Sequence, residues 1–296
     1  MDSNKSNKII LIIGGDLRQL HTANYFTLNY NVYIFGFDKE KINFSTLNVI
    51  DNLKKYDDFF DYIILPLPIS RDNIHINMPC SRNQFNLDRI IITLKNKGII
   101  FGGIINTKFN QTLKQKNISY FDYFEREELL ISNAIPTSEG AIQIAMEKLQ
   151  TTIYKQDILI IGYGRISKVL VKSLLGLGAK VNVAARNYSD MNWIEISGCK
   201  AIPILNLDNH LYKYGVIFNT VPHIILNEYK LKLLKKDCLI VDLASKPGGV
   251  DFKKANELGI KNIWALGLPG KTAPKTAGEI IAKTISNILE EKKQLL

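Results

Sequence analysis

The segment GYGRIS, residues 162–167, has the residue types and the spacing of a turn that binds phosphate groups. It follows the apolar run DILII and precedes a predicted helix, which Gly178 would end as a C-cap. Gly162 can make the tight turn, and Gly164 lets the backbone approach a pyrophosphate at a helix N-terminus. Ser167 replaces the usual third glycine, a mild departure because that position needs a small side chain. The predicted dinucleotide contacts here are Gly162, Tyr163, Gly164, Arg165 and Ile166.

The end of the next predicted strand carries a cation where a carboxylate is usual. An NAD site normally has an Asp or Glu about 20 residues after the first glycine, which holds the ribose 2′-hydroxyl. Neither residue type occurs from Gly162 to Ser189, and VNVAARN ends in Arg186 instead. A guanidinium can pair with a 2′-phosphate, and Asn187 and Ser189 can donate further hydrogen bonds. The sequence therefore predicts a preference for NADP over NAD, although Arg186 could also be only a solvated strand end.

Two later strand ends are candidates for the remaining walls of the cofactor site, because ligands of open α/β sheets bind where the strands end. Pro222 cannot continue a strand, so the chain must turn there. Residues of these types also commonly end strands and begin loops where no ligand binds, which explains them equally well. The predicted contacts are Thr220, Val221, Pro222, Leu243, Ala244 and Ser245.

These sites require parallel sheets with helices on both faces. Short apolar runs recur along the chain at intervals that leave room for a helix, and they do not alternate in polarity. We therefore expect an α/β protein with two doubly wound parallel-sheet domains. The N-terminal one, residues 1–140 plus a C-terminal helix in 275–296, is flavodoxin-like, and the other, residues 141–274, is a Rossmann dinucleotide-binding domain. The predicted strands cover 9–13, 31–37, 62–67, 98–104 and 118–124 in the first domain, and begin at 157, 181, 215, 238 and 262 in the second.

A helix is expected between the domains in IPTSEGAIQIAMEKL, residues 135–149, with Thr137 or Ser138 as its N-cap. Glu139 would then sit at the start of this helix, where the cleft between the domains should open. It is the candidate proton acceptor. The alternative role is a carboxylate that stabilises the helix N-terminus by about 0.3–1 kcal/mol.

Composition narrows the classes of ligand. The net charge of +10 could indicate nucleic acid, a membrane surface or small anions, but the basic residues are dispersed and no helix-turn-helix or basic helix is evident. We therefore expect small anionic ligands. The start, MDSNKSNK, is polar and the next apolar run is short, so neither export nor a membrane span is expected. The three cysteines lack metal-ligand spacing, which predicts reduced thiols and no metal.

Beyond these patterns, the chain resembles the family of dipicolinate synthase A subunits over nearly its whole length. The resemblance implies oxidation of dihydrodipicolinate to dipicolinate with NADP, in the mother-cell cytoplasm of a spore-forming bacterium. It also implies a partner, the flavoprotein-like B subunit of dipicolinate synthase, and is compatible with a homo-oligomer. The segments that carry it are GGDLRQL (14–20), GFD (36–38), ILP (64–66), FER (124–126), IPTSEG (135–140), GYGR (162–165), NTVP (219–222) and, most specifically, DLASKPGGVDF (242–252) and GLPGKTAPKTAG (267–278).

An enzyme of this kind must place the substrate beside the nicotinamide and bind two carboxylates, so cationic sites are expected. Asp16 and Arg18, at the turn GGDLR, are candidates for one site. Three lysines in glycine- and proline-rich loops are candidates for another, with solvated side chains as the alternative. These lysines are Lys246, Lys271 and Lys275. Lys246 is also a candidate catalytic residue, together with Glu139. Thr137 and Ser138 complete the predicted substrate contacts.

Two other functions compete with this one. A 2-hydroxy-acid dehydrogenase needs a histidine and an arginine near the substrate, and neither occurs in ASKPGG or GLPGKTAPKTAG. A non-catalytic NADP-binding subunit, whose partner performs the chemistry, stays open because no acid–base pair is evident. His223, directly after NTVP, is interpreted as a histidine that lines the cofactor pocket rather than a catalytic one.

Overall fold

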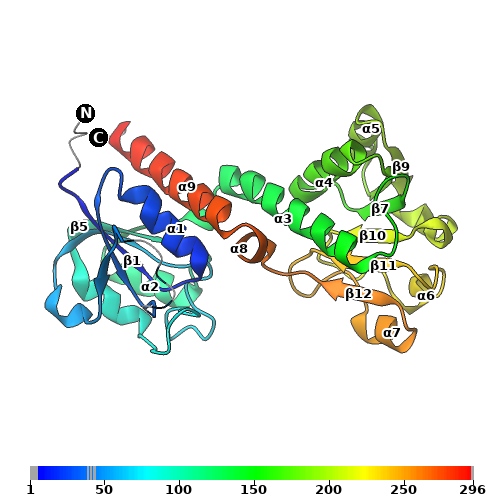
Figure 1. Ribbon diagram of the computed structural model, residues 1–296. Helices are drawn as coiled ribbons and strands as arrows, with labels where there is room; N and C mark the ends of the chain where they lie inside the picture. Colours follow the sequence, from blue (N-terminus) through cyan, green and yellow to red (C-terminus); the bar gives the residue numbers. More distant parts are fainter. Residues whose placement is uncertain (1–5, 39, 41, 43–44, 295–296) are drawn as a thin grey trace. The chain divides into compact units, whose positions relative to one another are not determined.

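Figure 1 shows the computed structural model, which describes residues 6–38, 40, 42 and 45–294. This part of the chain forms two compact units. Unit 1 contains the residues up to Asn133 and those from Ala273 onward, and unit 2 runs from Ala134 to Thr272. Most of the polar start on which the expectation about export rests, residues 1–5, lies outside the described residues. No helix among the described residues has both the length and the apolar character needed to cross a bilayer.

Unit 1 is built on a parallel sheet of six strands in the order β3-β2-β1-β4-β5-β6. The five predicted strands are present and keep the flavodoxin-like order 2-1-3-4-5 among themselves. The additional strand, β3, has three residues and extends the edge beside β2. The strands are β1 (Ile9–Ile13), β2 (Asn31–Phe35), β3 (Asn48–Ile50), β4 (Phe60–Ile64), β5 (Leu94–Gly102) and β6 (Ser119–Asp122).

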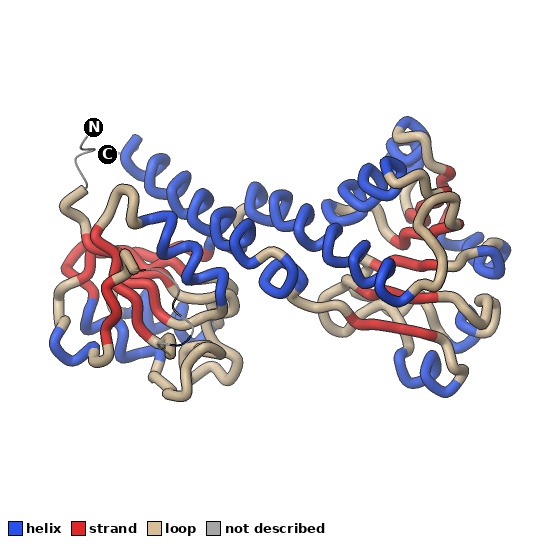
Figure 2. Tube along the Cα trace, in the orientation of Figure 1, coloured by secondary structure: helices blue, strands red, loops and turns tan. Residues whose placement is uncertain are grey.

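Helices cover both faces of this sheet, and one of them comes from the end of the chain (Figure 2). Helix α9 (Pro274–Gln294) packs on α1 (Leu17–Phe26), where the Thr22 hydroxyl donates to the Gly278 carbonyl at 3.0 Å. A Cβ at position 278 would collide with the Arg18 carbonyl, so this approach requires glycine. The other helical segments are η2 (Leu53–Lys55), η3 (Leu87–Thr93), α2 (Thr107–Gln115) and η4 (Tyr123–Glu125).

Unit 2 is a second parallel sheet of six strands, in the order β12-β11-β10-β7-β8-β9. Read from β9, this is the order 3-2-1-4-5-6 of the dinucleotide-binding fold, as predicted. Strand β9 lies at the edge and ends in Pro203, which explains why no clear strand pattern marks it in the sequence. The strands are β7 (Asp157–Ile161), β8 (Lys180–Ala185), β9 (Lys200–Pro203), β10 (Val216–Asn219), β11 (Leu239–Asp242) and β12 (Lys261–Trp264).

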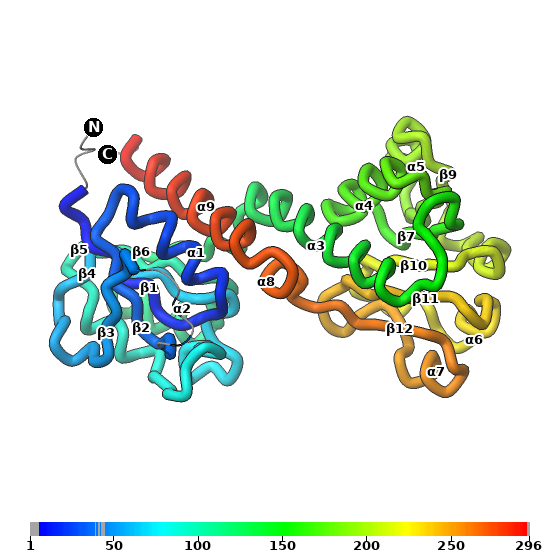
Figure 3. Tube along the Cα trace, in the orientation of Figure 1, coloured from blue at the N-terminus to red at the C-terminus, as the bar shows by residue number. Residues whose placement is uncertain are grey.

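One face of the unit 2 sheet is covered by a layer of three helices (Figure 3). These are α3 (Glu127–Lys148), α4 (Arg165–Gly176) and α5 (Tyr188–Ile196), with α4 between the other two. Their buried residues, such as Ala145, Leu174 and Ile194, pack on the sheet. The remaining helical segments of the unit are η5 (Ile204–Asn209), η6 (Leu211–Lys213), α6 (Glu228–Leu231), α7 (Phe252–Glu257) and α8 (Leu268–Thr272).

The start of α3 differs from the prediction. The helix begins at Glu127 and contains Pro136, so neither Thr137 nor Ser138 is an N-cap. Ser138 is fully buried, and its hydroxyl donates to the Ile166 carbonyl at 3.2 Å. A proline inside a helix removes one backbone hydrogen bond, but burial of side chains on both sides of Pro136 keeps the helix continuous. The local capping signal was therefore misleading, because tertiary packing extends the helix ten residues further back.

Candidate functional site

The two glycines of the GYGRIS turn have different reasons to be glycine. Gly162 has φ +94°, and a Cβ there would collide with the Thr220 hydroxyl and lie 2.8 Å from a Val221 methyl carbon. Gly164 is the N-cap of α4 with an ordinary φ of −87°, and a Cβ there would meet no atom within 4 Å. The packing of the protein therefore demands glycine only at 162. At 164 the backbone is open to a ligand, as a pyrophosphate site at a helix N-terminus requires.

Ser167, the third position of the pattern, joins three elements. It is fully buried, and its hydroxyl lies 2.9 Å from that of Thr220. Thr220 in turn donates to the Ile161 carbonyl at 2.9 Å. A small polar side chain thus ties α4 to the ends of β7 and β10, which explains why serine replaces glycine here. The predicted contacts at 162–166 and at Thr220 and Val221 are therefore neighbours.

Tyr163 points away from this turn toward α5. Its hydroxyl lies 3.1 Å from the Ser197 hydroxyl, and the Lys168 ammonium lies 5.6 Å from its ring centroid. The Tyr163 side chain therefore belongs to the surface between α4 and α5, and only its backbone lies in the turn. Arg165 is exposed in the first turn of α4.

Arg186 directly follows β8, the strand beside the fingerprint turn, and its side chain is exposed. The Gly162 N–H donates to the Ala184 carbonyl at 2.9 Å, which keeps the two strand ends together. Asn187 is the N-cap of α5: its carbonyl oxygen accepts from the Asp190 N–H at 2.7 Å, and its amide donates to the Asp190 carboxylate at 2.9 Å. Ser189 is exposed in the same turn. Asn187 therefore already has a structural role, while Arg186 is accessible to an anion.

The two later strand ends are held by a buried pair that the sequence analysis did not single out. Asn219 and Asp242 are register partners in β10 and β11, both fully buried, and joined by a 2.7 Å hydrogen bond. Asp242 also accepts from the N–H groups of Ala244, at 3.0 Å, and Gly249, at 2.7 Å. The available signal was a polar residue that closes an otherwise apolar strand, as in VIFN and LIVD.

This network limits what the predicted cofactor walls can contact. The Asn219 side chain binds both the N–H and the carbonyl of Val221, at 3.2 and 3.0 Å. Leu243 and Ala244 are buried, and the Ala244 carbonyl accepts from the Trp264 indole N–H at 2.9 Å. Pro222, Ser245 and Lys246, in contrast, are exposed, although the Ser245 carbonyl accepts from the Gly248 N–H at 2.8 Å. The network thus shapes the two loops, and their exposed tips remain the parts that a ligand can reach.

In unit 1, the predicted substrate residues Asp16 and Arg18 form an ion pair. The Asp16 carboxylate caps α1 by accepting from the Arg18 N–H at 3.1 Å and receives two guanidinium hydrogen bonds of 2.9 Å. The guanidinium also donates to the Leu67 carbonyl at 3.0 Å. Burial alone would lower the pKa of Arg18, but the hydrogen bond and charge of Asp16 more than offset it and raise the pKa. The positive charge of Arg18 is therefore already balanced within the protein.

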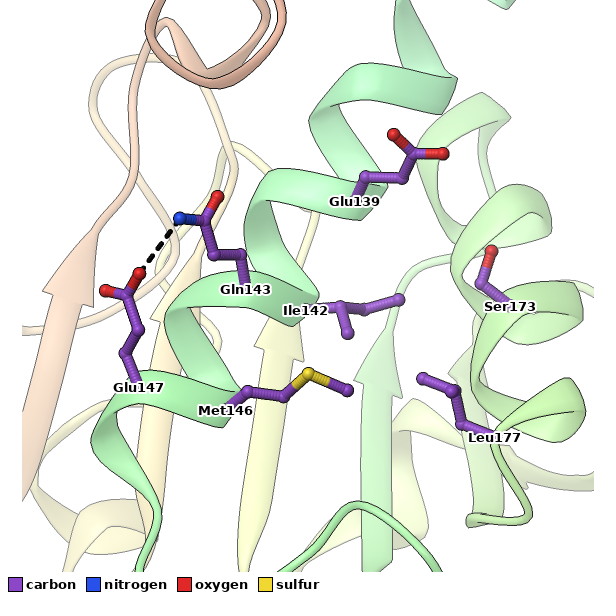
Figure 4. A pocket seen from close by; sticks show the side chains of 7 residues that line it. All are labelled: Glu139, Ile142, Gln143, Met146, Glu147, Ser173 and Leu177. Atoms are coloured by element: carbon purple, nitrogen blue, oxygen red, sulfur yellow. Dashed lines mark hydrogen bonds between the residues drawn. The ribbon is translucent and has the colours of Figure 1, made fainter.

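Glu139 lies in the middle of α3, not at its start, so neither the predicted position nor a role at the helix N-terminus applies. Its exposed side chain points into a groove of about 540 Å³ between α3 and the second half of α4 (Figure 4). Ser173 and Leu177 line the opposite side of this groove. The other predicted substrate lysines, Lys271 in unit 2 and Lys275 in unit 1, are both exposed.

Two family models match the chain. The N-terminal domain of the dipicolinate synthase A subunit matches residues 9–124, and the shikimate/quinate 5-dehydrogenase family matches residues 143–266. The A subunit of dipicolinate synthase from Bacillus subtilis (strain 168) is 35% identical over 289 residues, which cover 95% of this chain and 96% of that protein.

Solved structures agree with these matches. The crystal structure of the dipicolinate synthase A subunit from Bacillus halodurans has a TM-score of 0.88 and 31% identity, covering 97% of this chain and 99% of that one. A transhydrogenase from Sinorhizobium meliloti has a TM-score of 0.70 at 14% identity, covering 96% of this chain and 94% of that one. The latter likeness shows a shared fold.

The role of Asp242 can be tested by Asp242→Asn. The new amide would place an N–H₂ group against a buried backbone N–H or the Asn219 amide, which should lower the free energy of unfolding by about 1–3 kcal/mol. Urea denaturation measures this change. Asp251→Asn is the matched control, because Asp251 caps α7 by accepting from the Lys254 N–H at 3.0 Å, and asparagine caps equally well. Equal losses in the two variants would contradict a special role for Asp242.

Proposed function

The chain belongs to the family of dipicolinate synthase A subunits, and from that premise we propose that it oxidises dihydrodipicolinate to dipicolinate with NADP bound to unit 2. The dehydrogenase-type fold supports an oxidoreductase, and the strand order of unit 2 supports a dinucleotide site at the end of β7. When bound, NADP supplies the hydride acceptor. The residues of the chain itself must hold the dinucleotide, orient the substrate and take up a proton.

The observation that carries this proposal is the open backbone at Gly164. Nothing in the described part of the protein occupies the position of a Cβ there, although Gly162, two residues earlier, is closely packed. The Gly164 N-cap also has no side chain to satisfy the free N–H groups of α4. A pyrophosphate can accept these hydrogen bonds, and its approach would explain glycine at a position where the fold alone does not need it.

We propose that Arg186 sets the preference for NADP. Its exposed guanidinium follows β8, and no carboxylate occurs in the chain from the fingerprint turn to Ser189. The nearest acidic group along α5 is Asp190, whose carboxylate is held by the Asn187 amide. A 2′-phosphate would form charge-assisted hydrogen bonds with Arg186, with Ser189 as a second donor.

The substrate presents two carboxylates and loses a hydride and a proton as its ring becomes aromatic. We propose that exposed cations, Lys246, Lys271 and Lys275, bind these carboxylates, with Thr137 and the Asp16–Arg18 pair as polar contacts. Arg18 is the weaker candidate, because its charge is balanced by Asp16. Ser138 is buried and bonded to the Ile166 carbonyl, so it supports α3 rather than offering its hydroxyl freely. Glu139 is the proposed proton acceptor.

We further propose that the enzyme works in the mother-cell cytoplasm of a sporulating bacterium together with a second, flavoprotein-like subunit. The designation of its Bacillus subtilis relative as an A subunit supports a partner. The test is to mix dihydrodipicolinate and NADP with this chain alone and then with the B subunit, and to follow the absorbance of NADPH. Turnover by the chain alone supports the proposal, whereas no turnover in either mixture contradicts it. Turnover only with the B subunit also fits a catalytic chain that needs its partner. It would favour the non-catalytic role if Glu139→Gln and Lys246→Ala left that turnover unchanged.

Gly164→Ala should separate ligand binding from stability. A methyl group would meet no protein atom, so the melting temperature should stay within about 2 °C, while NADP affinity should fall by on the order of tenfold or more. Gly162→Ala is the matched comparison, since strain and collision there should lower stability as well. Calorimetry and thermal unfolding measure both effects. Unchanged NADP affinity in the 164 variant would remove the fingerprint from the cofactor site.

Arg186→Ala should discriminate between the two dinucleotides. The loss of charge-assisted hydrogen bonds to a 2′-phosphate should weaken NADP binding by about 10- to 100-fold. NAD lacks that phosphate, so its affinity should change by less than about twofold. Titration calorimetry with both dinucleotides provides the measurement. An equal loss for NAD and NADP would show that Arg186 does not read the phosphate.

Glu139→Gln tests the proton acceptor. Removing a general base should reduce kcat by about 10²–10⁴-fold and leave KM nearly unchanged. Glu147→Gln is the control, because Glu147 lies two turns away in the same groove and has no proposed part in catalysis. A Glu139→Gln enzyme with normal kcat would exclude this residue from the mechanism.

A further inference from the structure

The outer surface of unit 2 carries two grooves of opposite charge, one on each side of α4. The acidic groove, between α3 and α4, has a volume of about 540 Å³, and the basic groove, between α4 and α5, about 570 Å³. Figure 4 shows the acidic groove, where Glu139, Ile142 and Met146 of α3 point toward α4, while Gln143 and Glu147 extend from the other flank of α3. The acidic groove is lined by Glu139, Ile142, Gln143, Met146, Glu147, Ser173 and Leu177, and the basic groove by Tyr163, Lys168, Val171, Lys172, Leu175, Trp193 and Ser197.

The charges of each groove are spaced along one helix. Glu139 and Glu147 are eight residues apart on α3, which separates them by about 12 Å along the helix axis and by about 80° around it, on either side of Gln143. Lys168 and Lys172 are four residues apart on α4, or about 6 Å. None of these four side chains forms an ion pair within the described residues; Glu147 accepts only from the Gln143 amide, at 2.9 Å.

Large apolar side chains are exposed on the same surface. The exposed fractions are 49% for Met146 beside the acidic groove and 58% for Trp193 beside the basic one. Ile196, which is 73% exposed, and Tyr188 extend this surface along α5. Helix α5 buries Ile194 against the sheet, and it also carries the large apolar side chains of Tyr188, Trp193 and Ile196 in exposed positions. A surface helix normally keeps its outer side polar, so this pattern indicates a surface that another protein covers.

We propose that this surface, the α3–α4–α5 layer of unit 2, binds the same layer of a second copy of the chain. A two-fold axis parallel to α4 and in the plane of the surface would place the acidic groove of each copy over the basic groove of the other. Each contact then occurs twice, as in an isologous dimer. Complementary charges favour this partner, because both halves of the match are present on one chain. Trp193 and Met146 would supply the apolar centre.

Charge reversal gives a self-consistent test by analytical ultracentrifugation over a range of concentrations. The wild type should dimerise. The acidic variant carries Lys168→Glu with Lys172→Glu, and the basic variant carries Glu139→Lys with Glu147→Lys. In each variant like charges would face one another across the interface, which should raise the dissociation constant of the dimer by on the order of a hundredfold. Mixed in equal amounts, the two variants should form a heterodimer with nearly wild-type affinity, since every contact again joins opposite charges.

A second pair of variants tests the apolar centre. Trp193→Asp should give a monomer, whereas Leu205→Asp should leave the mass unchanged, because Leu205 is 94% exposed on unit 2 but lines neither groove. Circular dichroism confirms folding in each case. A wild type that stays monomeric, or a dimer whose mass is insensitive to both charge variants and to Trp193→Asp, overturns the proposal. Failure of the mixed variants to associate also contradicts the two-fold pairing.

Discussion

The hydrogen bond between Asn219 and Asp242 is the interaction on which the candidate site depends. Both side chains are fully buried at the carboxyl ends of neighbouring strands, where water cannot solvate a carboxylate. Asp242 is stable there because it accepts from one amide and two backbone N–H groups, which replace the lost hydration. The same bonds fix the loops after β10 and β11. The shape of the site is thus set by two residues that need not touch a ligand.

The glycines around this network separate the demands of the fold from those of a ligand. Gly249 approaches the Asn219 amide so closely that a Cβ would collide with it, and Gly162 is confined by Thr220 and Val221. These positions follow from packing alone. Gly164 does not, because its backbone is ordinary and its surroundings are open. A glycine that the packing of the protein does not require is stronger support for a binding site than a glycine that the core requires.

The sequence predicts the sheets better than the details of the site. Buried parallel strands such as β1 and β7 are continuous apolar runs, so their number and type are visible, whereas β3 and β9 are short edge strands without such a run. The predicted start of α3 was wrong because a local capping signal at Thr137 and Ser138 competes with packing that only the folded chain reveals. Asn219 and Asp242 escaped notice because their importance arises from pairing between strands 23 residues apart.

Helix α4 connects the proposed cofactor site to the proposed dimer surface, and packing against the sheet holds this helix in place. Its inner side chains, Leu170 and Leu174, are fully buried against the sheet, so the helix cannot shift without disturbing the core. Its N-terminus faces the fingerprint turn, while its flanks form the two grooves. The exception is Tyr163, whose backbone lies between the fingerprint glycines and whose ring lines the basic groove. Assembly can therefore affect the active site through Tyr163 and through Glu139, the proposed proton acceptor, which lines the acidic groove.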